Sequence, residues 1–184
     1  MRNLLCTLAG GLLLAAPLHA TGLEIDVAGE ANGTIIIDLA EDVAPNHVAQ
    51  IVALAEDGAY DGVVFHRVID GFMAQTGDVQ HGRPGGNMSL AGTGGSDRDD
   101  LAAEFSDRSF ERGTVGMARS ASPNSANSQF FIMFDAAPHL DGEYTVVGQV
   151  TDGLDVLDAI KRGAGGNGAV TDAPDVMQAV RVTE

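Results

Sequence analysis

The sequence of 184 residues is poor in several residue types, and it has one cysteine, Cys6, and no tryptophan. Because Cys6 lies in an apolar N-terminal segment, the remainder of the chain has no disulfide, no thiolate nucleophile and no cysteine-based metal site. The candidate histidine ligands His66, His81 and His139 lack metal-ligand spacing. A Gly-x-Ser-x-Gly elbow is also absent, which argues against a serine hydrolase.

Positive charge is scarce as well. The chain has 10 lysine and arginine residues against 26 aspartate and glutamate residues, which gives a formal net charge of -16. Such a chain repels nucleic acid and anionic lipid head groups, so we expect neither as a partner. The acidic run 97–100 lacks the spaced alternation and late glutamate of a calcium loop, so we interpret it as a solvated loop.

The one sustained apolar run at the N-terminus, residues 4–14, is too short to span a bilayer. Arg2 precedes it, and a stretch of small residues ending at Ala20 follows it, a pattern typical of a secretory signal peptide. An uncleaved membrane anchor is the alternative. We predict a signal peptide over residues 1–20 and a single domain over residues 21–184, exported and not bound to the membrane after cleavage.

The first half of this domain shows clear strand and helix patterns. Apolar residues predict strands over 24–27 and 34–39, joined by a tight turn at Asn32-Gly33. Pro45 is a typical first residue of a helix, whose apolar positions repeat at helical spacing until Asp57-Gly58.

The second half alternates loops with short strands. A second helix is predicted over 152–162, capped by Asp152 and stopped by Gly163. Many short strands with two helices favour a mainly β fold, a closed antiparallel barrel with helices over its ends. The remaining predictions are an irregular glycine-rich loop over 81–96, strands over 103–105, 113–118, 129–134, 144–150 and 176–182, and a flexible linker over 163–168.

The stretch 63–77 reads as a strand, an Asp70-Gly71 turn and a second strand. The alternation places Arg67 on the same strand face as Val63, Phe65 and Ile69, where a buried guanidinium needs a partner. Gln75 lies across the turn and offers an amide. A floor that mixes apolar and polar side chains is typical of a small ligand site, whereas the alternative is an arginine that reaches solvent from a strand end.

The same stretch resembles the signature of the cyclophilins, a class of peptidyl-prolyl cis-trans isomerases. The resemblance extends over most of residues 23–183. The segments that carry it are Phe65-His66-Arg67, Gly71-Phe72-Met73, Gln75, Gly77-Asp78, Gly92-Thr93-Gly94-Gly95, Met117-Ala118-Arg119, Ser128-Gln129-Phe130-Phe131-Ile132, Leu140-Asp141-Gly142 and Val146-Val147-Gly148.

This resemblance implies a closed eight-stranded antiparallel β-barrel capped by two α-helices, and it implies a role for each matching residue. The catalytic arginine of the family falls on Arg67. The pocket tryptophan and histidine of its best-known eukaryotic members are replaced here by His139 and Tyr144, which implies a larger effect on drug affinity than on catalysis. The tyrosine at position 144 resembles the residue that bacterial exported cyclophilins have at this position. The other implied site residues are Phe72, Met73, Phe131 and Leu140 for the proline pocket, Gln75 and Gln129 for support, and Ala118 and Arg119 for main-chain contacts with the peptide.

The implied activity is isomerisation of X-Pro peptide bonds, without cofactor, metal or covalent intermediate. The expected partners are proline-containing segments of unfolded or exported proteins, with weak cyclosporin binding, and we expect a monomer in a Gram-negative periplasm. A non-catalytic peptide-binding holdase on the same fold is the alternative, and Arg67 distinguishes the two. A purely structural barrel leaves the convergence of Arg67, Gln75 and Gln129 unexplained.

Overall fold

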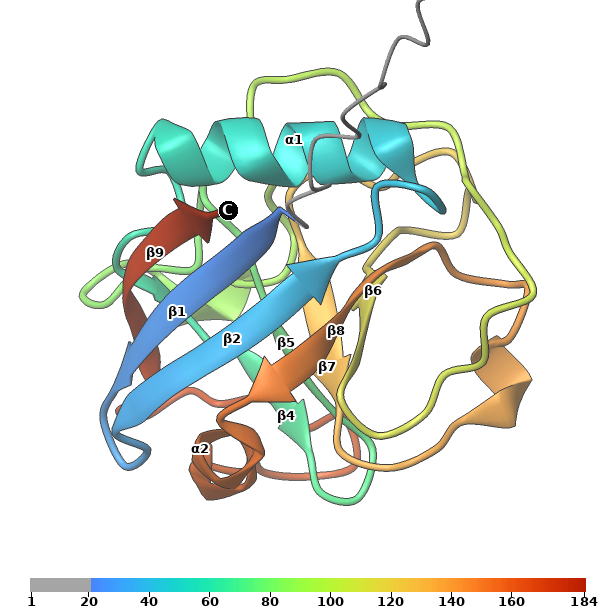
Figure 1. Cartoon of the computed structure of the whole chain (residues 1–184). Helices are drawn as coiled ribbons and strands as arrows, with labels where there is room; N and C mark the ends of the chain where they lie inside the picture. Colours follow the sequence, from blue (N-terminus) through green and yellow to red (C-terminus); the bar gives the residue numbers. More distant parts are fainter. Residues whose placement is uncertain (1–20) are drawn as a thin grey trace, which may run out of the picture.

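The computed structural model describes residues 21–184, and these form one curled antiparallel sheet with two α-helices (Figure 1). The strand order is β3-β9-β1-β2-β8-β6-β7-β5-β4. None of the helices in this part of the chain has the length and apolar character of a membrane span. The strands are β1 (Gly22–Ala28), β2 (Gly33–Leu39), β3 (Val63–Val64), β4 (Arg67–Ile69), β5 (Met73–Thr76), β6 (Thr114–Met117), β7 (Phe130–Met133), β8 (Val146–Asp152) and β9 (Val176–Thr183).

The two end strands of the sheet, β3 and β4, are consecutive segments of the chain separated by Phe65 and His66. The sheet therefore curls, so that its two end strands are separated by only these two residues along the chain. The mainly β character with two helices is confirmed. The expected count of eight strands is not, because the single strand predicted from residue 63 onward divides in two: β3 pairs with β9 and β4 pairs with β5.

This division also corrects the predicted face of Arg67. Val63 and Phe65 pack in the main core together with Val68, whereas Ile69 packs with a second apolar cluster beside Arg67. Phe65 and His66 belong to neither strand, and they break the alternation on which the prediction was based. Arg67 consequently lies on the outer face of the sheet, away from the main core.

The helices close the two ends of the curled sheet, with α1 (Pro45–Glu56) packed against β9 and α2 (Leu154–Ala159) against β2 (Figure 1). Proline opens α1 as predicted, and its buried stripe includes Val48 and Ile51. The prediction for α2 was too long and its cap was wrong. Gly153, with φ +83°, occupies the N-cap position, and no side chain caps the helix.

Two further predictions concern segments outside the sheet. The strand predicted over 103–105 does not form, although Leu101 makes an isolated antiparallel bridge to Ala126. The glycine-rich loop over 81–96 is irregular as predicted, apart from one short 3-10 helix, η1 (Met88–Leu90). A second such helix, η2 (Pro138–Leu140), lies between β7 and β8.

The apolar residues form two clusters, one on each face of β5 and β7. In β7, Phe130 and Ile132 point into the main core, while Phe131 and Met133 point into the second cluster. The members of the second cluster are Met73, Phe110, Phe131, Met133, Ala137, Leu140 and Val146, with Ile69, Phe72, Ala118 and Tyr144 packed against them.

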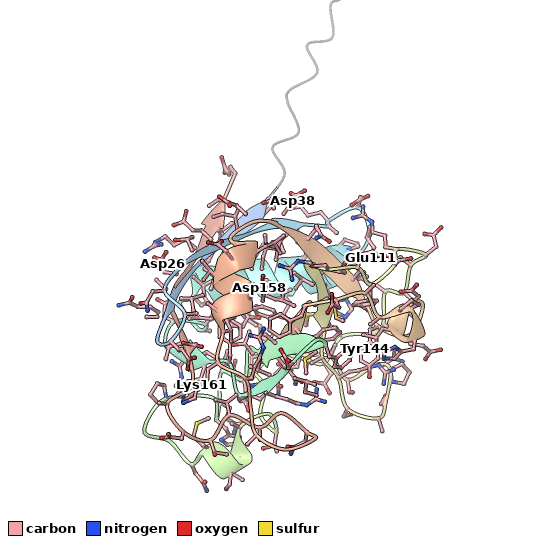
Figure 2. All side chains as sticks on the ribbon, turned by 90° about the horizontal axis from the view of Figure 1, so that it is seen from below. Asp26, Asp38, Glu111, Tyr144, Asp158 and Lys161 are labelled. Carbon is pink, nitrogen blue, oxygen red and sulfur yellow. The ribbon has the colours of Figure 1, made fainter. Side chains whose placement is uncertain are left out.

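The acidic side chains are distributed differently from the apolar ones. Asp26, Asp38, Glu111 and Asp158, labelled in Figure 2, come from separate elements around the surface.

Candidate active site

A pocket of about 170 Å³ opens on the outer face of the sheet, over β4, β5 and β7. Nine of the eleven site residues expected from the sequence line it, which means that segments far apart in the chain converge as the resemblance implies. Gln129 and His139 lie beside the pocket and not in its lining. The lining residues are Arg67, Phe72, Met73, Gln75, Ala118, Arg119, Phe131, Leu140 and Tyr144.

Arg67 is held from two directions. Its Nη1 donates to Oε1 of Gln75 at 3.1 Å, because the register of the β4–β5 pair places these two residues opposite each other. Its Nε donates to the main-chain carbonyl of Asn167 at 3.0 Å. No residue among 21–184 accepts a hydrogen bond from Nη2 of Arg67. A half-buried guanidinium with two fixed edges and one open edge therefore faces the pocket.

The glutamines form a relay that orients Gln75. Nε2 of Gln75 donates to Oε1 of Gln129 at 2.9 Å, and Nε2 of Gln129 donates to the carbonyl of Gly94 at 2.7 Å. Because each amide donates away from the arginine, the oxygen of Gln75 must face Arg67. Gln129 thus contacts Gln75 through a hydrogen bond and does not itself line the pocket.

Aromatic packing fixes the apolar wall. The ring of Phe131 stacks on Phe110, with centroids 5.7 Å apart, and meets Tyr144 edge to face at 5.8 Å. A Cβ at Gly116 would come within 2.6 Å of both phenylalanine rings, so this strand position needs a glycine. Sequence reasoning missed the roles of Phe110 and Gly116, for which a glycine inside a predicted strand was the available signal.

Arg119 contributes its side chain, whereas the sequence analysis assigned it only main-chain contacts. Its guanidinium carbon lies 4.4 Å from the centroid of the Tyr144 ring, a cation–π geometry. The two terminal nitrogens donate to the carbonyls of Ser120 and Glu143. Tyr144 is therefore clamped between Arg119 and Phe131, which fixes the pocket wall.

His139 occupies the rim. It is exposed and stacks on Phe72, with ring centroids 5.8 Å apart and planes at 25°. The imidazole extends the apolar surface of the pocket outward without entering the lining. The position expected to affect drug binding is thus next to the pocket but outside its lining.

A second, polar hollow of about 430 Å³ adjoins the first and shares Gln75, Ala118 and Arg119 with it. Residues 92–96 of the glycine-rich loop, Asp100 and polar residues of the 120–129 segment line the remainder. Asp78 holds this loop by accepting from the N–H groups of Gly92 and Gly94 at 2.7 and 3.0 Å. Burial raises the pKa of Asp78, but the N–H donors of His81, Gly94 and Gly92 hold it below its ordinary value, so the carboxylate remains ionised.

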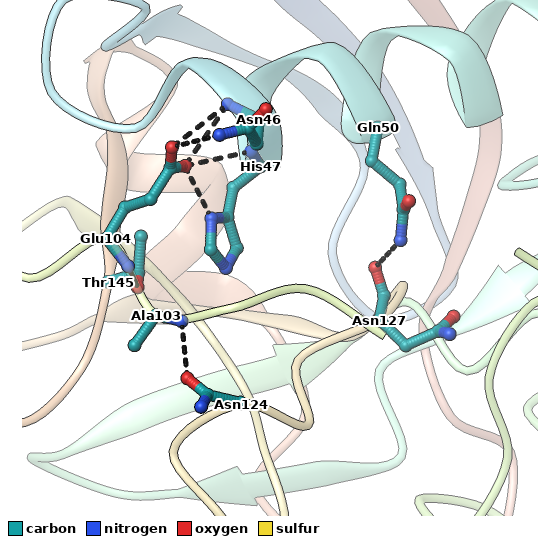
Figure 3. Close-up of polar contacts among 8 residues, drawn as sticks. All are labelled: Asn46, His47, Gln50, Ala103, Glu104, Asn124, Asn127 and Thr145. Atoms are coloured by element: carbon teal, nitrogen blue, oxygen red, sulfur yellow. Dashed lines mark hydrogen bonds and ion pairs between the residues drawn. The ribbon is translucent and has the colours of Figure 1, made fainter. Parts of the chain in front are cut away.

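A polar framework connects this region to α1 (Figure 3). Glu104 accepts from the N–H groups of Asn46 and His47 at the helix start and from Nδ1 of His47 at 2.7 Å. Its own N–H donates to Thr145, the neighbour of Tyr144. Burial raises the pKa of Glu104, but the donors on His47 and Asn46 together hold it below its ordinary value.

His66, next to Arg67, is buried, and neither ring nitrogen has a hydrogen-bond partner among residues 21–184. Burial is the largest influence on its pKa and, with the positive charge of Arg67, holds it below the ordinary value against the opposing effects of Asp78, the Val64 carbonyl and Gln129. A neutral imidazole next to Arg67 avoids placing a second positive charge there.

This combination of an outward-facing apolar pocket and a fixed arginine on a curled, helix-capped sheet defines a peptidyl-prolyl isomerase of the cyclophilin type. The family model for "Cyclophilin type peptidyl-prolyl cis-trans isomerase/CLD" matches residues 23–182. The chain belongs to this family and is a peptidyl-prolyl cis-trans isomerase, an enzyme that acts without a covalent intermediate.

Individual relatives agree. A Brucella suis protein named "Probable peptidyl-prolyl cis-trans isomerase" is 57% identical over 151 residues, covering 80% of this chain and 77% of that protein. A Synechococcus elongatus peptidyl-prolyl cis-trans isomerase is 42% identical over 133 residues, covering 71% and 84%. The crystal structure of a Cryptosporidium parvum cyclophilin, determined in the presence of the dipeptide Ala-Pro, has a TM-score of 0.74 at 25% identity and covers 89% of this chain and 99% of that one.

Proposed function

We propose that the Arg67 pocket is the catalytic site of this isomerase and that its substrates are X-Pro bonds in exported proteins. The observation that supports this most is the arrangement of Arg67, which is held at Nη1 by Gln75 and at Nε by Asn167 beside an apolar pocket. The pocket walls Phe72, Met73, Phe131 and Leu140 suit a proline ring. Ala-Pro in the related crystal structure supports a proline-containing ligand.

The chemistry requires only a positioned donor. Rotation about an X-Pro bond meets a barrier of roughly 18–20 kcal/mol because the amide loses resonance as it twists. In the twisted state the prolyl nitrogen recovers its lone pair and becomes a better hydrogen-bond acceptor. A guanidinium fixed toward that nitrogen stabilises the transition state more than the planar ground state, and arginine remains charged throughout.

The peptide must also be held while one part rotates. The apolar walls grip the proline ring, and main-chain groups of Ala118 and Arg119 hold the adjoining residues. The N–H of Ala118 already donates to the carbonyl of Gln129 at 2.9 Å, so other main-chain groups of this segment contact the peptide in our proposal. Every ~1.4 kcal/mol of preferential stabilisation gives a tenfold faster rate.

We also propose that the protein acts outside the cytoplasm, as a monomer of one domain over residues 21–184, in a Gram-negative periplasm. The predicted signal peptide, residues 1–20, lies outside the described residues. Arg2, the following apolar run and Ala20 support export. N-terminal sequencing of the periplasmic fraction should give a chain beginning near Thr21. Recovery of an intact Met1 from the membrane pellet would instead indicate an anchor.

The rival proposal is a holdase that binds proline peptides without accelerating their exchange. A protease-coupled or NMR exchange assay on a short X-Pro peptide separates the two. We expect faster exchange with the mature protein and the same rate after EDTA treatment. A folded sample that binds the peptide without accelerating exchange would support the holdase, and activity lost with EDTA would contradict the proposed chemistry.

A further inference from the structure

The glycine-rich segment 163–168, predicted as a flexible linker, packs along β4. The N–H of Val68 donates to the carbonyl of Gly168 at 2.7 Å, and the N–H of Gly163 donates to the carbonyl of Val68 at 2.9 Å. Arg67 and Ala169 form an antiparallel bridge. The segment therefore extends the sheet beyond its end strand, directly behind the reaction arginine.

Within this segment, Asn167 makes the contact that reaches Arg67. Its main-chain carbonyl accepts from Nε of Arg67 at 3.0 Å, while Gln75 accepts from Nη1 of the same guanidinium. A planar guanidinium fixed at two edges cannot turn about the bond from Cδ to Nε. If only Gln75 held the guanidinium, that rotation would become possible, and the orientation of Nη2 would no longer be fixed.

The contact depends on a glycine at the next position. Gly168 has φ +68°, and a Cβ there would lie 2.7 Å from the carbonyl oxygen of Val68 and 2.5 Å from Cγ1 of Ile69. Any other residue must move the Asn167–Gly168 backbone away from β4. Gly166, two residues earlier, differs on both counts: its φ is not positive, and a Cβ there would meet nothing within 4 Å.

The geometry points to the Asn167–Gly168 step as a positioning element for catalysis: the Asn167 carbonyl aims the Arg67 guanidinium at the prolyl nitrogen. This inference rests on the proposed role of Arg67. Electrostatic stabilisation requires a donor oriented before the reaction, and the step acts on that orientation. It does not line the pocket, so peptide binding should be largely independent of it.

The first test compares Gly168→Ala with the matched control Gly166→Ala in an X-Pro exchange assay. We expect Gly168→Ala to lower kcat about ten- to a hundredfold, part of the loss seen when a preorganised donor is removed, with KM little changed. Gly166→Ala should retain the wild-type kcat. Equal kcat values for the two variants, or a loss confined to KM, would overturn the inference.

A double-mutant cycle separates positioning from general disruption. In an Arg67→Ala background, Gly168→Ala should cause no further loss, because the group that the step orients is gone. A full additional loss would show that the step acts by another route. If Arg67→Ala itself keeps wild-type turnover, the proposed function of Arg67 fails, whereas normal activity of Gly168→Ala alone refutes only the positioning role.

Hydrogen exchange of the Arg67 Nε–H, followed by NMR and assigned from its absence in Arg67→Lys, gives a readout independent of turnover. Exchange should be faster in Gly168→Ala and unchanged in Gly166→Ala. Should Gly168→Ala fail to fold, Gly165→Ala provides the same test. Gly165 also has a positive φ, +69°, but a Cβ there would meet only the side chain of Asn167. An unchanged Nε–H exchange rate together with unchanged kcat would overturn the inference.

Discussion

The four residues of strand β7 alternate between two faces of the sheet, and the two faces have different surroundings. On the inner face, Phe130 is fully enclosed and meets Tyr60 edge to face at 5.6 Å. On the outer face, Phe131 stacks on Phe110 and lines the pocket that contains Arg67. One face therefore packs in the main core, and in our proposal the other presents the surface on which a peptide is held. Substitutions on the two faces should separate stability from catalysis.

The largest expected effect is on the outer face, at Arg67. Arg67→Ala should lower kcat/KM on the order of 10²–10³-fold, as for the loss of one preorganised donor. The unfolding transition should change little, because the side chain faces a pocket and not the main core. Exchange kinetics and thermal unfolding on the same sample measure both quantities, and near-normal turnover would remove Arg67 from its role.

Arg67→Lys tests whether charge alone is sufficient. A single ammonium cannot contact Gln75, Asn167 and the peptide in one plane, so this variant should also be poor. Wild-type turnover in Arg67→Lys would show that geometry at this position is unimportant.

The next effect concerns the rim of the outer face. The cyclosporin-sensitive family members carry a tryptophan where this chain has His139, which stacks on Phe72 outside the pocket lining. A tryptophan adds apolar area worth roughly 25 cal/mol per Å², so His139→Trp should tighten cyclosporin binding about ten- to a hundredfold. Turnover should change little. Titration of both proteins in one exchange assay measures this, and equal, tight inhibition of the two would refute it.

The smallest expected effect is on stability, and it concerns the polar contacts of Glu104 with the start of α1. The folded state holds the pKa of Glu104 below its ordinary value of 4.5, so the unfolded chain takes up this proton at a higher pH. The stabilisation is thus present above about pH 4.5 and is lost as the pH falls through the lower folded-state pKa. Glu104→Gln should reduce the acid dependence of the unfolding free energy. Denaturant titrations at several pH values check this, and an unchanged slope would contradict it.

Most of the fold could be predicted from the sequence because its signals are local. Alternation in β1, β2 and β9 and the proline that opens α1 need no tertiary information, and the structure confirms them. The signature residues also converge on one pocket as expected, because the resemblance fixes their spacing.

The failures share a different cause. The face of Arg67 was wrong because the break at Phe65 and His66 arises from pairing with two different strands, β9 and β5. The contact between Asn167 and Arg67 joins residues 100 positions apart through a main-chain carbonyl, which no side-chain pattern encodes. Glycine runs resembled a linker because their conformational requirement appears only against β4.

The central claim, that the outer face of the sheet carries the isomerase site, is tested most directly by Phe130→Leu and Phe131→Leu. These variants make the same change at adjacent positions on opposite faces. Their unfolding free energies and their kcat/KM per folded molecule on one X-Pro peptide should be measured together. We expect Phe130→Leu to lose about 1 kcal/mol or more of stability with nearly normal kcat/KM, and Phe131→Leu to lose mainly kcat/KM. Equal catalytic losses in the two variants would contradict the claim.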